Sequence, residues 1–379
     1  MKKFLQNKWF LIGSVMVLLI GLTIVAAVWV LYASYSKSVV TTAELTSPHP
    51  NPTPTPTPDP LDPYSIALLG YGGPGHDGGA LTDTIILAYI QPRKKSIHLI
   101  TIPRDIWVEL PLLPDGQTKG YKLNAAYAVG TDETQFKDRP VEFTGKGGGG
   151  SLAKYALAQV TGINPTYFFA LNFYAFEHAL DQLGGIEVRV PQGFDDPFYP
   201  IETEKNNTCT KSEEEIAALS ATLSGDLLAE QFLCRYEHLY FEAGSQLMDG
   251  ATALKYVRSR HSSQSGNDFS RSQRQLAVIE AVKKRVLNLN FVPKILPLIQ
   301  SLSANIQTDI DATTLTELIA ASKELEDYSI DRVILSEKNV LQSSRSADRQ
   351  YILTAQPSTQ SAQPWSSVHQ YVLDQVDQN

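Results

Sequence analysis

The chain has 379 residues, of which 43% are hydrophobic, so it has room for one large domain or two ordinary ones with a sizeable core. Its formal net charge is -8 at pH 7, which argues against nucleic acid as a partner, because domains that bind nucleic acid tend to be basic overall.

The N-terminal segment predicts a membrane anchor. Lys2, Lys3 and Lys8 precede an uncharged apolar run over residues 9–33, which is long enough to cross a bilayer. The positive flank predicts that residues 1–8 are a cytoplasmic tail and that the rest of the chain lies outside the cell. A cleaved signal peptide is the alternative, although its apolar region is shorter.

The next segment, residues 34–63, predicts an extracellular linker. Its last part, SPHPNPTPTPTPDPLDP, has prolines at alternate positions, which enforce an extended polyproline II conformation and prevent a packed core. At about 3.1 Å per residue, residues 47–63 would form a stalk of roughly 50 Å. The stalk would hold the globular part, residues 64–379, away from the membrane.

Strands alternate with helices along residues 64–379, which predicts a single α/β domain with helices on both faces of a mixed sheet. Ser151 is the expected N-cap of the first long helix. The strongest strand patterns lie at 65–69, 83–90, 97–102, 167–173 and 186–190, with weaker ones at 333–335 and 351–354. Helical patterns lie at 151–160, 176–183, 250–256 and 270–289.

An arginine cluster stands out between Val257 and Gln275 (VRSRHSSQSGNDFSRSQRQ). The planar donors of arginine suit phosphate oxygens, so the cluster predicts an anion site, for a phosphate or a pyrophosphate. Its arginines are Arg258, Arg260, Arg271 and Arg274, and Asp268 is its only acid. The alternative is a solvated charged face, because surface arginines often pair with acids at little net gain.

The position of the second half of this cluster favours the anion site. A turn at residues 266–268 precedes a helix, on which Arg271, Arg274 and Gln275 are spaced to share one face. They lie in the first turn, where unpaired backbone N–H groups also attract anions.

Three further polar residues lie at strand ends, where α/β sheets place ligands. Asp83 opens one strand, and Arg104 and Asp105 follow the next. Asp83 adjoins a glycine-rich loop, GYGGPGHDGG, so it could hold a divalent cation, or it could merely cap a turn. The loop lacks the G-K-[ST] ending of a nucleotide-binding P-loop, and its Asp77 is a second possible metal ligand.

Two cysteines, Cys209 and Cys234, occur in the part of the chain predicted to be extracellular. There, one disulfide between them is the simplest expectation. Two unpaired thiols are the alternative, and the CxxC spacing of a metal or redox site is absent from the sequence.

Taken in order, these residues resemble the LytR-CpsA-Psr family of cell-wall polymer ligases. Any one matching stretch is modest evidence, but the ordered set spans most of the domain. The matching stretches are LLG (Leu68–Gly70), LTDTIIL (Leu81–Leu87), ITIPRD (Ile100–Asp105), KLNAAYA (Lys122–Ala128), TGINPTYFFALNFYAF (Thr161–Phe176), LDQLGGIEVRVP (Leu180–Pro191), AGSQLMDGATALKYVRSR (Ala243–Arg260), DFSRSQRQ (Asp268–Gln275) and NIQTDI (Asn305–Ile310).

The resemblance implies a phosphotransferase that moves an anionic glycopolymer, such as a teichoic acid, from a polyprenyl-pyrophosphate carrier to a sugar hydroxyl of peptidoglycan. It implies that Mg²⁺ is a cofactor held by Asp83, and that Asp105 orients Arg104 or accepts the proton of the attacking hydroxyl. The pyrophosphate would be bound by Arg104, Arg258, Arg260, Arg271 and Gln275.

The sequence departs from the family pattern at one point. Many members have a second metal-binding aspartate just after the LLG strand, where this chain has Tyr71 and Gly72. A non-catalytic protein that binds lipid phosphate or cell wall is therefore an alternative function. A hydrolase that uses the same site to release the polymer to water is another.

Overall fold

The computed structural model describes residues 61–76, 78–262, 266, 268–288, 295–321, 327–358 and 363–377. The predicted cytoplasmic tail and membrane anchor, and all but the end of the predicted linker, lie outside these ranges. In the part of the chain that is described, no helix combines the length and apolar character needed to cross a membrane.

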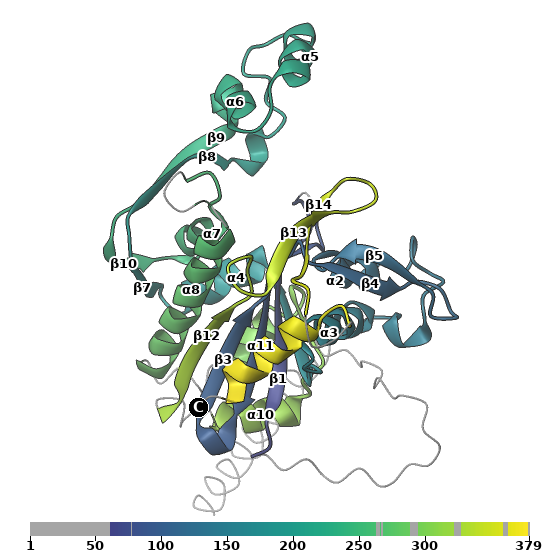
Figure 1. The fold of residues 1–379 in the computed structure, drawn as a ribbon. Helices are drawn as coiled ribbons and strands as arrows, with labels where there is room; N and C mark the ends of the chain where they lie inside the picture. The colour runs from purple at the N-terminus through teal and green to yellow at the C-terminus, as the bar shows by residue number, and fades with distance from the viewer. Residues whose placement is uncertain are drawn as a thin grey trace, which may run out of the picture.

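A six-stranded mixed sheet forms the centre of the fold (Figure 1). β1 pairs antiparallel with β2 and parallel with β6, and β3 pairs antiparallel with β2 and parallel with β12, which confirms the predicted mixed sheet. The strand order is β11 (Ile306–Thr308), β6 (Tyr167–Asn172), β1 (Tyr64–Tyr71), β2 (Thr82–Gln91), β3 (Ser96–Thr101) and β12 (Ser329–Ile334).

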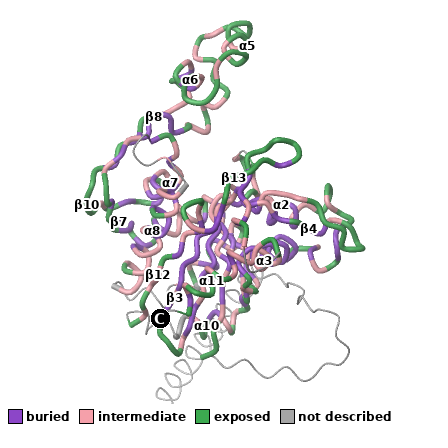
Figure 2. Tube along the Cα trace, in the orientation of Figure 1, coloured by how far each residue is buried: buried purple, intermediate pink, exposed green. Residues whose placement is uncertain are grey.

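Most residues of the central strands are buried (Figure 2), and their side chains pack on both faces of the sheet. On β2, Ile85 and Leu87 face one hydrophobic cluster, whereas Ile86 and Ala88 face another, as the two-residue period of a strand requires. The first cluster includes residues of α2 (Ala125–Thr131), α3 (Gly148–Thr161) and α11 (Ser366–Asp377). The opposite face packs against α4 (Phe173–Gln182), α8 (Asp268–Asn288), α9 (Ile295–Ser301) and α10 (Ala312–Ala321).

The C-terminal residues contribute to this core. Val368, Val372 and Val376 of α11 are buried in the same cluster as α3. Of the weak strand patterns near the C-terminus, the one at 333–335 overlaps the end of β12 and the one at 351–354 lies within β14 (Tyr351–Ala355), which pairs with β13 (Leu341–Arg345).

The predicted start of the first long helix was wrong. α3 begins at Gly148, so Ser151 lies inside it, and its backbone N–H donates to the carbonyl of Gly147. The glycines continue the helix because it packs too closely for side chains: a Cβ at Gly150 would lie 2.2 Å from the ring of Phe168. The sequence pattern gave no sign of this contact.

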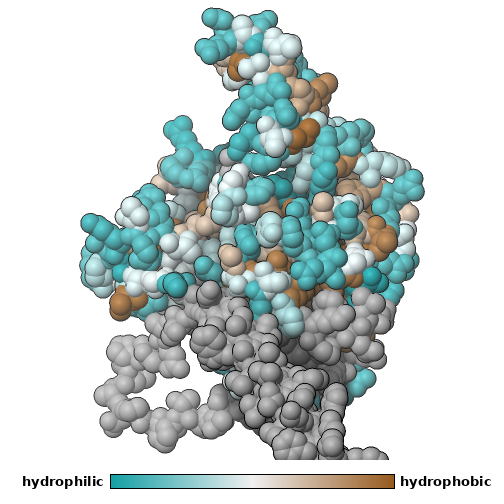
Figure 3. Space-filling model, turned by 180° about the vertical axis from the view of Figure 1, so that it is seen from behind, coloured by the Kyte–Doolittle hydropathy of each residue, from teal (hydrophilic) through white to brown (hydrophobic). Residues whose placement is uncertain are grey.

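Besides the β13–β14 pair, the described residues form three other two-stranded sheets outside the central sheet. β4 (Trp107–Pro111) pairs with β5 (Thr118–Lys122), and β7 (Ile186–Val190) pairs with β10 (Gly244–Met248). The third ribbon, β8 (Phe194–Pro200) with β9 (Tyr236–Phe241), is the base of an arm that projects from the body (Figure 1). On the face seen in Figure 3, the surface of the arm is mostly hydrophilic.

The arm carries α5 (Glu213–Thr222) and α6 (Asp226–Ala229) beyond its two strands. A disulfide joins Cys209 to Cys234 and closes this segment. α5 begins with a capping box, in which Ser212 and Glu215 bond each other's backbone N–H groups. The polar segment thus becomes ordered through a cap and a covalent link rather than through a large apolar core.

Candidate functional site

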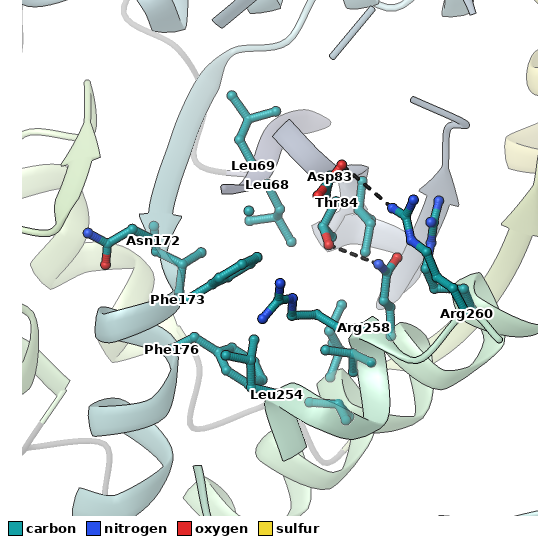
Figure 4. Close-up of a pocket in the computed structure, with 18 of the residues that line it drawn as sticks. Leu68, Leu69, Asp83, Thr84, Asn172, Phe173, Phe176, Leu254, Arg258 and Arg260 are labelled. Carbon is teal, nitrogen blue, oxygen red and sulfur yellow. Dashed lines mark hydrogen bonds and ion pairs between the residues drawn. The ribbon is translucent and has the colours of Figure 1, made fainter. Parts of the chain in front are cut away.

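A cavity of about 500 Å³ lies between the central sheet and helices α4, α7 (Gly250–Arg258) and α8 (Figure 4). Most of its lining is apolar, and charged side chains from the predicted arginine cluster join that lining. The apolar lining comes from Leu68, Leu69, Ile86, Phe169, Leu171, Phe173, Phe176, Leu254, Val257, Val278, Ile279 and Val282. Such a chamber can hold a hydrocarbon chain beside a bound anion.

Close packing of α7 against α4 fixes the position of the first arginine. The N-cap Asp249 accepts a hydrogen bond from Thr252, and the backbone N–H of Gly250 donates to Asp181 at 2.8 Å. A Cβ at Gly250 would lie 2.1 Å from the carbonyl oxygen of Glu177, so only glycine allows this approach. The helix ends at Arg258, whose side chain is thereby directed into the cavity.

Arg258 lies among aromatic rings. Its guanidinium carbon is 4.4 Å from the ring centroid of Phe173, and one of its nitrogens donates to the hydroxyl of Tyr199 at 3.2 Å. Figure 4 shows this side chain reaching toward Phe173. Cation–π contact holds the guanidinium in place while it keeps its full charge for an anion.

A chain of alternating charges runs along the other side of the site. Lys122 and Arg104 both approach the carboxylate of Asp105, at 2.6 and 3.5 Å. Arg104 also bonds Asp83 at 2.6 Å, and Arg260 approaches the same Asp83 oxygen at 3.6 Å. The strand-end residues predicted from sequence are therefore brought together with the arginine cluster, and Asp105 is placed to orient Arg104.

The first turns of α8 supply two more residues. Gln275 donates to the hydroxyl of Thr84 at 2.8 Å, and Arg271 lines the same cavity. Both side chains are largely buried. A guanidinium in such a water-poor place interacts more strongly with an anion than one at the surface would.

Arg274 follows Arg271 by about one helical turn, but it is not among the residues that line the described cavities. It is buried, donates to the carbonyl of Ser259 at 2.5 Å, and lies 4.9 Å from the ring centroid of Phe194. Burial lowers the pKa of Arg274 to about 10, so the group stays protonated at neutral pH. Its role is to support the turn after α7 rather than to line the cavity.

Asp196, on β8 at the base of the arm, supports the same turn and was not found by sequence reasoning. It is fully buried, and one carboxylate oxygen accepts from the hydroxyl of Ser259 at 2.7 Å. That oxygen also accepts from the backbone N–H groups of Arg260 and His261, at 2.9 and 3.1 Å. A carboxylate with several N–H donors fixes a loop strongly, so Asp196 sets the position of Arg260.

Asp83 is the described residue best suited to hold a metal ion. It is partly exposed to the cavity, while Asp77 lies outside the described residues. No group of three or more His, Cys, Asp or Glu side chains that could hold a metal occurs among the residues described. At position 72, a Cβ would lie 2.7 Å from the Cβ of His76, which explains why an aspartate there would be hard to accommodate.

A single carboxylate still fits Mg²⁺, because proteins commonly bind this ion through one or two carboxylates together with substrate phosphates and water. Asp83 borders the arginine-lined cavity, where such phosphates would lie. The donor set therefore fits an ion that needs the bound substrate to complete its coordination.

Comparison with known proteins agrees with this fold. The model of the LytR_cpsA_psr family matches residues 28–363. A polyisoprenyl-teichoic acid–peptidoglycan teichoic acid transferase, TagU of Enterococcus faecalis, is 28% identical over 251 residues, which cover 66% of this chain and 62% of that protein. TagV of Bacillus subtilis, which is also named a polyisoprenyl-teichoic acid–peptidoglycan teichoic acid transferase, is 27% identical over 256 residues, which cover 66% of this chain and 51% of that protein.

A solved structure supports the fold. The crystal structure of Bacillus subtilis TagV aligns with a TM-score of 0.53 and 21% identity, and covers 84% of this chain and 98% of that one. Since the family model covers far more than half of the sequence, the chain belongs to the LytR_cpsA_psr family.

Proposed function

We propose that this protein is a membrane-anchored phosphotransferase of cell-wall assembly. It moves an anionic glycopolymer from a polyprenyl-pyrophosphate carrier to a sugar hydroxyl of peptidoglycan. The observation that carries this proposal is the arginine-lined end of a largely apolar cavity. One site thereby offers a place for a pyrophosphate and for the hydrocarbon attached to it. The names of the two transferase relatives support the more general statement that a teichoic acid is transferred to peptidoglycan.

The chemistry needs positioning and charge neutralisation more than covalent help from the protein. A new bond joins the sugar oxygen to phosphorus, the bond to the carrier's phosphate oxygen breaks, and the hydroxyl proton is released to solvent. Arg258, Arg260 and Arg271 neutralise the pyrophosphate and the charge that develops on the leaving phosphate. Arg104 contributes from the other side, oriented by Asp105.

Asp105 serves this reaction better by orienting Arg104 than by accepting a proton. Its carboxylate already contacts two cations, Lys122 and Arg104. Each of its two carboxylate oxygens is thus already engaged by one of these cations.

Mg²⁺ is part of the proposal, with Asp83 as its protein ligand. When bound, the ion would neutralise phosphate charge. Asp83 also bonds Arg104 and approaches Arg260. These two contacts would keep its carboxylate beside the phosphates whether or not the ion is bound.

The proposed location follows from the N-terminal sequence. Residues 9–33 would anchor the chain, residues 1–8 would stay in the cytoplasm, and residues 64–379 would act outside the cell. The carrier lipid would lie in the same membrane as the anchor, so the enzyme and its donor would share one membrane.

The test uses purified full-length protein, Mg²⁺ and a pyrophosphate-linked glycopolymer donor. Release of polyprenyl phosphate is measured with and without peptidoglycan. Transfer of polymer to peptidoglycan supports the proposal. Binding without turnover would favour a non-catalytic lipid-phosphate protein, and polymer release to water despite the acceptor would favour a hydrolase.

A further inference from the structure

A second cavity, of about 520 Å³, adjoins the first one. The two cavities share Asp83, Arg271 and Gln275 in their linings. Arg104 lines only the second cavity, whereas Arg258 and Arg260 line only the first of these two. The shared residues therefore lie between the two cavities and form a charged partition, with one cavity on each side.

The lining of the second cavity differs from that of the first. Phe269 of α8 and Tyr351 of β14 contribute aromatic rings, and Lys338 lies 4.7 Å from the ring centroid of Phe269. Tyr351 is 43% exposed, so its ring is accessible from outside. Ser336 and Glu337 add polar groups. Aromatic rings with polar neighbours suit a sugar, whose ring has an apolar face and a polar edge.

We propose that this second cavity binds the acceptor glycan, a hexosamine chain of peptidoglycan, with Tyr351 and Phe269 as its aromatic contacts. The inference rests on the proposed function. In phosphoryl transfer the attacking and leaving oxygens lie roughly in line with phosphorus. If the lipid phosphate leaves toward the apolar cavity, the attacking hydroxyl has to arrive from the opposite side of the charged partition, where the second cavity lies.

A third cavity, of about 560 Å³, borders Arg258 and is less suitable. Its lining includes the carboxylates of Glu177, Glu202 and Glu237. It does not include Asp83, Arg271 or Gln275, so a hydroxyl bound there would not face the shared residues. Negative charges would also repel an acceptor that carries carboxyl groups.

The test separates acceptor binding from donor binding in full-length protein. Tyr351→Ala and Phe269→Ala are compared with Tyr351→Phe, which keeps the ring, and with Tyr240→Ala, an exposed tyrosine on the arm. Loss of one aromatic contact is expected to raise KM for peptidoglycan oligosaccharides about tenfold. KM for the pyrophosphate-linked donor, and its slow cleavage by water without acceptor, should stay unchanged, and Tyr351→Phe should match the wild type.

Calorimetry provides a readout that does not depend on turnover. A soluble peptidoglycan oligosaccharide is titrated into protein saturated with geranyl pyrophosphate. Weaker oligosaccharide binding in both alanine variants, at wild-type thermal stability, supports the acceptor cavity. If this weaker binding is seen but the wild type transfers no polymer, the proposed function fails and the acceptor cavity stands. The opposite result is that the wild type transfers polymer while both alanine variants keep the wild-type KM and affinity for the acceptor. That result would overturn the acceptor cavity but not the proposed function. A raised KM for the donor alone would instead assign the cavity to the donor polymer, and would overturn the inference.

Discussion

Two regions of the molecule bury arginine in different ways. Arg139 is almost fully buried, and its guanidinium donates to the carbonyls of Phe143, Asp132 and Gly130 at 2.6, 2.9 and 2.8 Å, and to Glu133 at 2.7 Å. The arginines of the site instead contact aromatic rings and carboxylates, and they face a cavity. The difference indicates that Arg139 holds a loop together, whereas the site arginines are arranged for a ligand.

The largest expected effect is a loss of transfer when an arginine of the site is removed. Arg271→Ala should lower transfer about 10²–10³-fold, because it removes a preorganised charge at the developing negative charge. Arg271→Lys should recover only part of the rate, since lysine lacks the planar fork. The control is Arg189→Ala, an exposed arginine on β7. Steady-state transfer rates check this prediction, and a wild-type rate in Arg271→Ala would contradict the site.

Arg139→Ala should lower stability without lowering the transfer rate of the folded protein. Removing this side chain leaves several buried carbonyls without their donor, so the free energy of unfolding should fall by about 3 kcal/mol. The folded fraction should still transfer polymer at the wild-type rate per active molecule. Chemical denaturation together with active-site titration measures both quantities, and an unchanged midpoint would mean that the loop does not depend on Arg139.

Asp196→Asn should fall between these two cases, because Asp196 is buried like Arg139 but acts on a site arginine. The neutral amide accepts the three bonds from residues 259–261 more weakly, so Arg260 should lose its fixed position. We expect transfer to fall about tenfold, which corresponds to about 1.4 kcal/mol, with a moderate loss of stability. Inorganic pyrophosphate affinity should weaken in parallel. Loss of stability with unchanged pyrophosphate affinity would make Asp196 purely structural.

A smaller effect is expected for the metal. With Asp83 as the only carboxylate ligand among the described residues, Mg²⁺ should bind weakly to the free protein and more tightly once geranyl pyrophosphate is present. Calorimetric titration with MgCl₂, with and without the prenyl pyrophosphate, measures this coupling. Asp83→Asn should abolish the coupling, and equal Mg²⁺ affinity in both conditions would contradict a metal that depends on substrate phosphates.

Much of the fold could be predicted from local patterns. The strands at 65–69, 83–90 and 97–102 correspond to β1, β2 and β3, because most of their buried side chains are β-branched or aliphatic. The early start of α3 could not be predicted, since it depends on contacts of glycines with Phe168 and Phe143, far away in sequence or across a turn. Local propensity disfavours glycine in helices, and tertiary packing overrode it.

The candidate site was likewise predictable only where local sequence patterns carried the information. The clustering of arginines in an acidic chain pointed to Arg258, Arg260 and Arg271, and the family resemblance added Gln275. The structure places all four around one cavity. The sequence left the role of Arg274 open, because spacing alone does not show that its side chain contacts Ser259 and Phe194. Asp196 carried no sequence signal, since its partners are backbone N–H groups more than sixty residues away.

The central claim is that the arginines bind a pyrophosphate whose hydrocarbon enters the apolar cavity. The most direct measurement compares the affinities of inorganic pyrophosphate and geranyl pyrophosphate for the wild-type protein and for Arg271→Ala. Each buried methylene contributes about 0.8 kcal/mol, so the account predicts that the prenyl compound binds at least tenfold more tightly, and that both ligands weaken in the variant. Equal affinity for the two compounds, or no loss in Arg271→Ala, would contradict it.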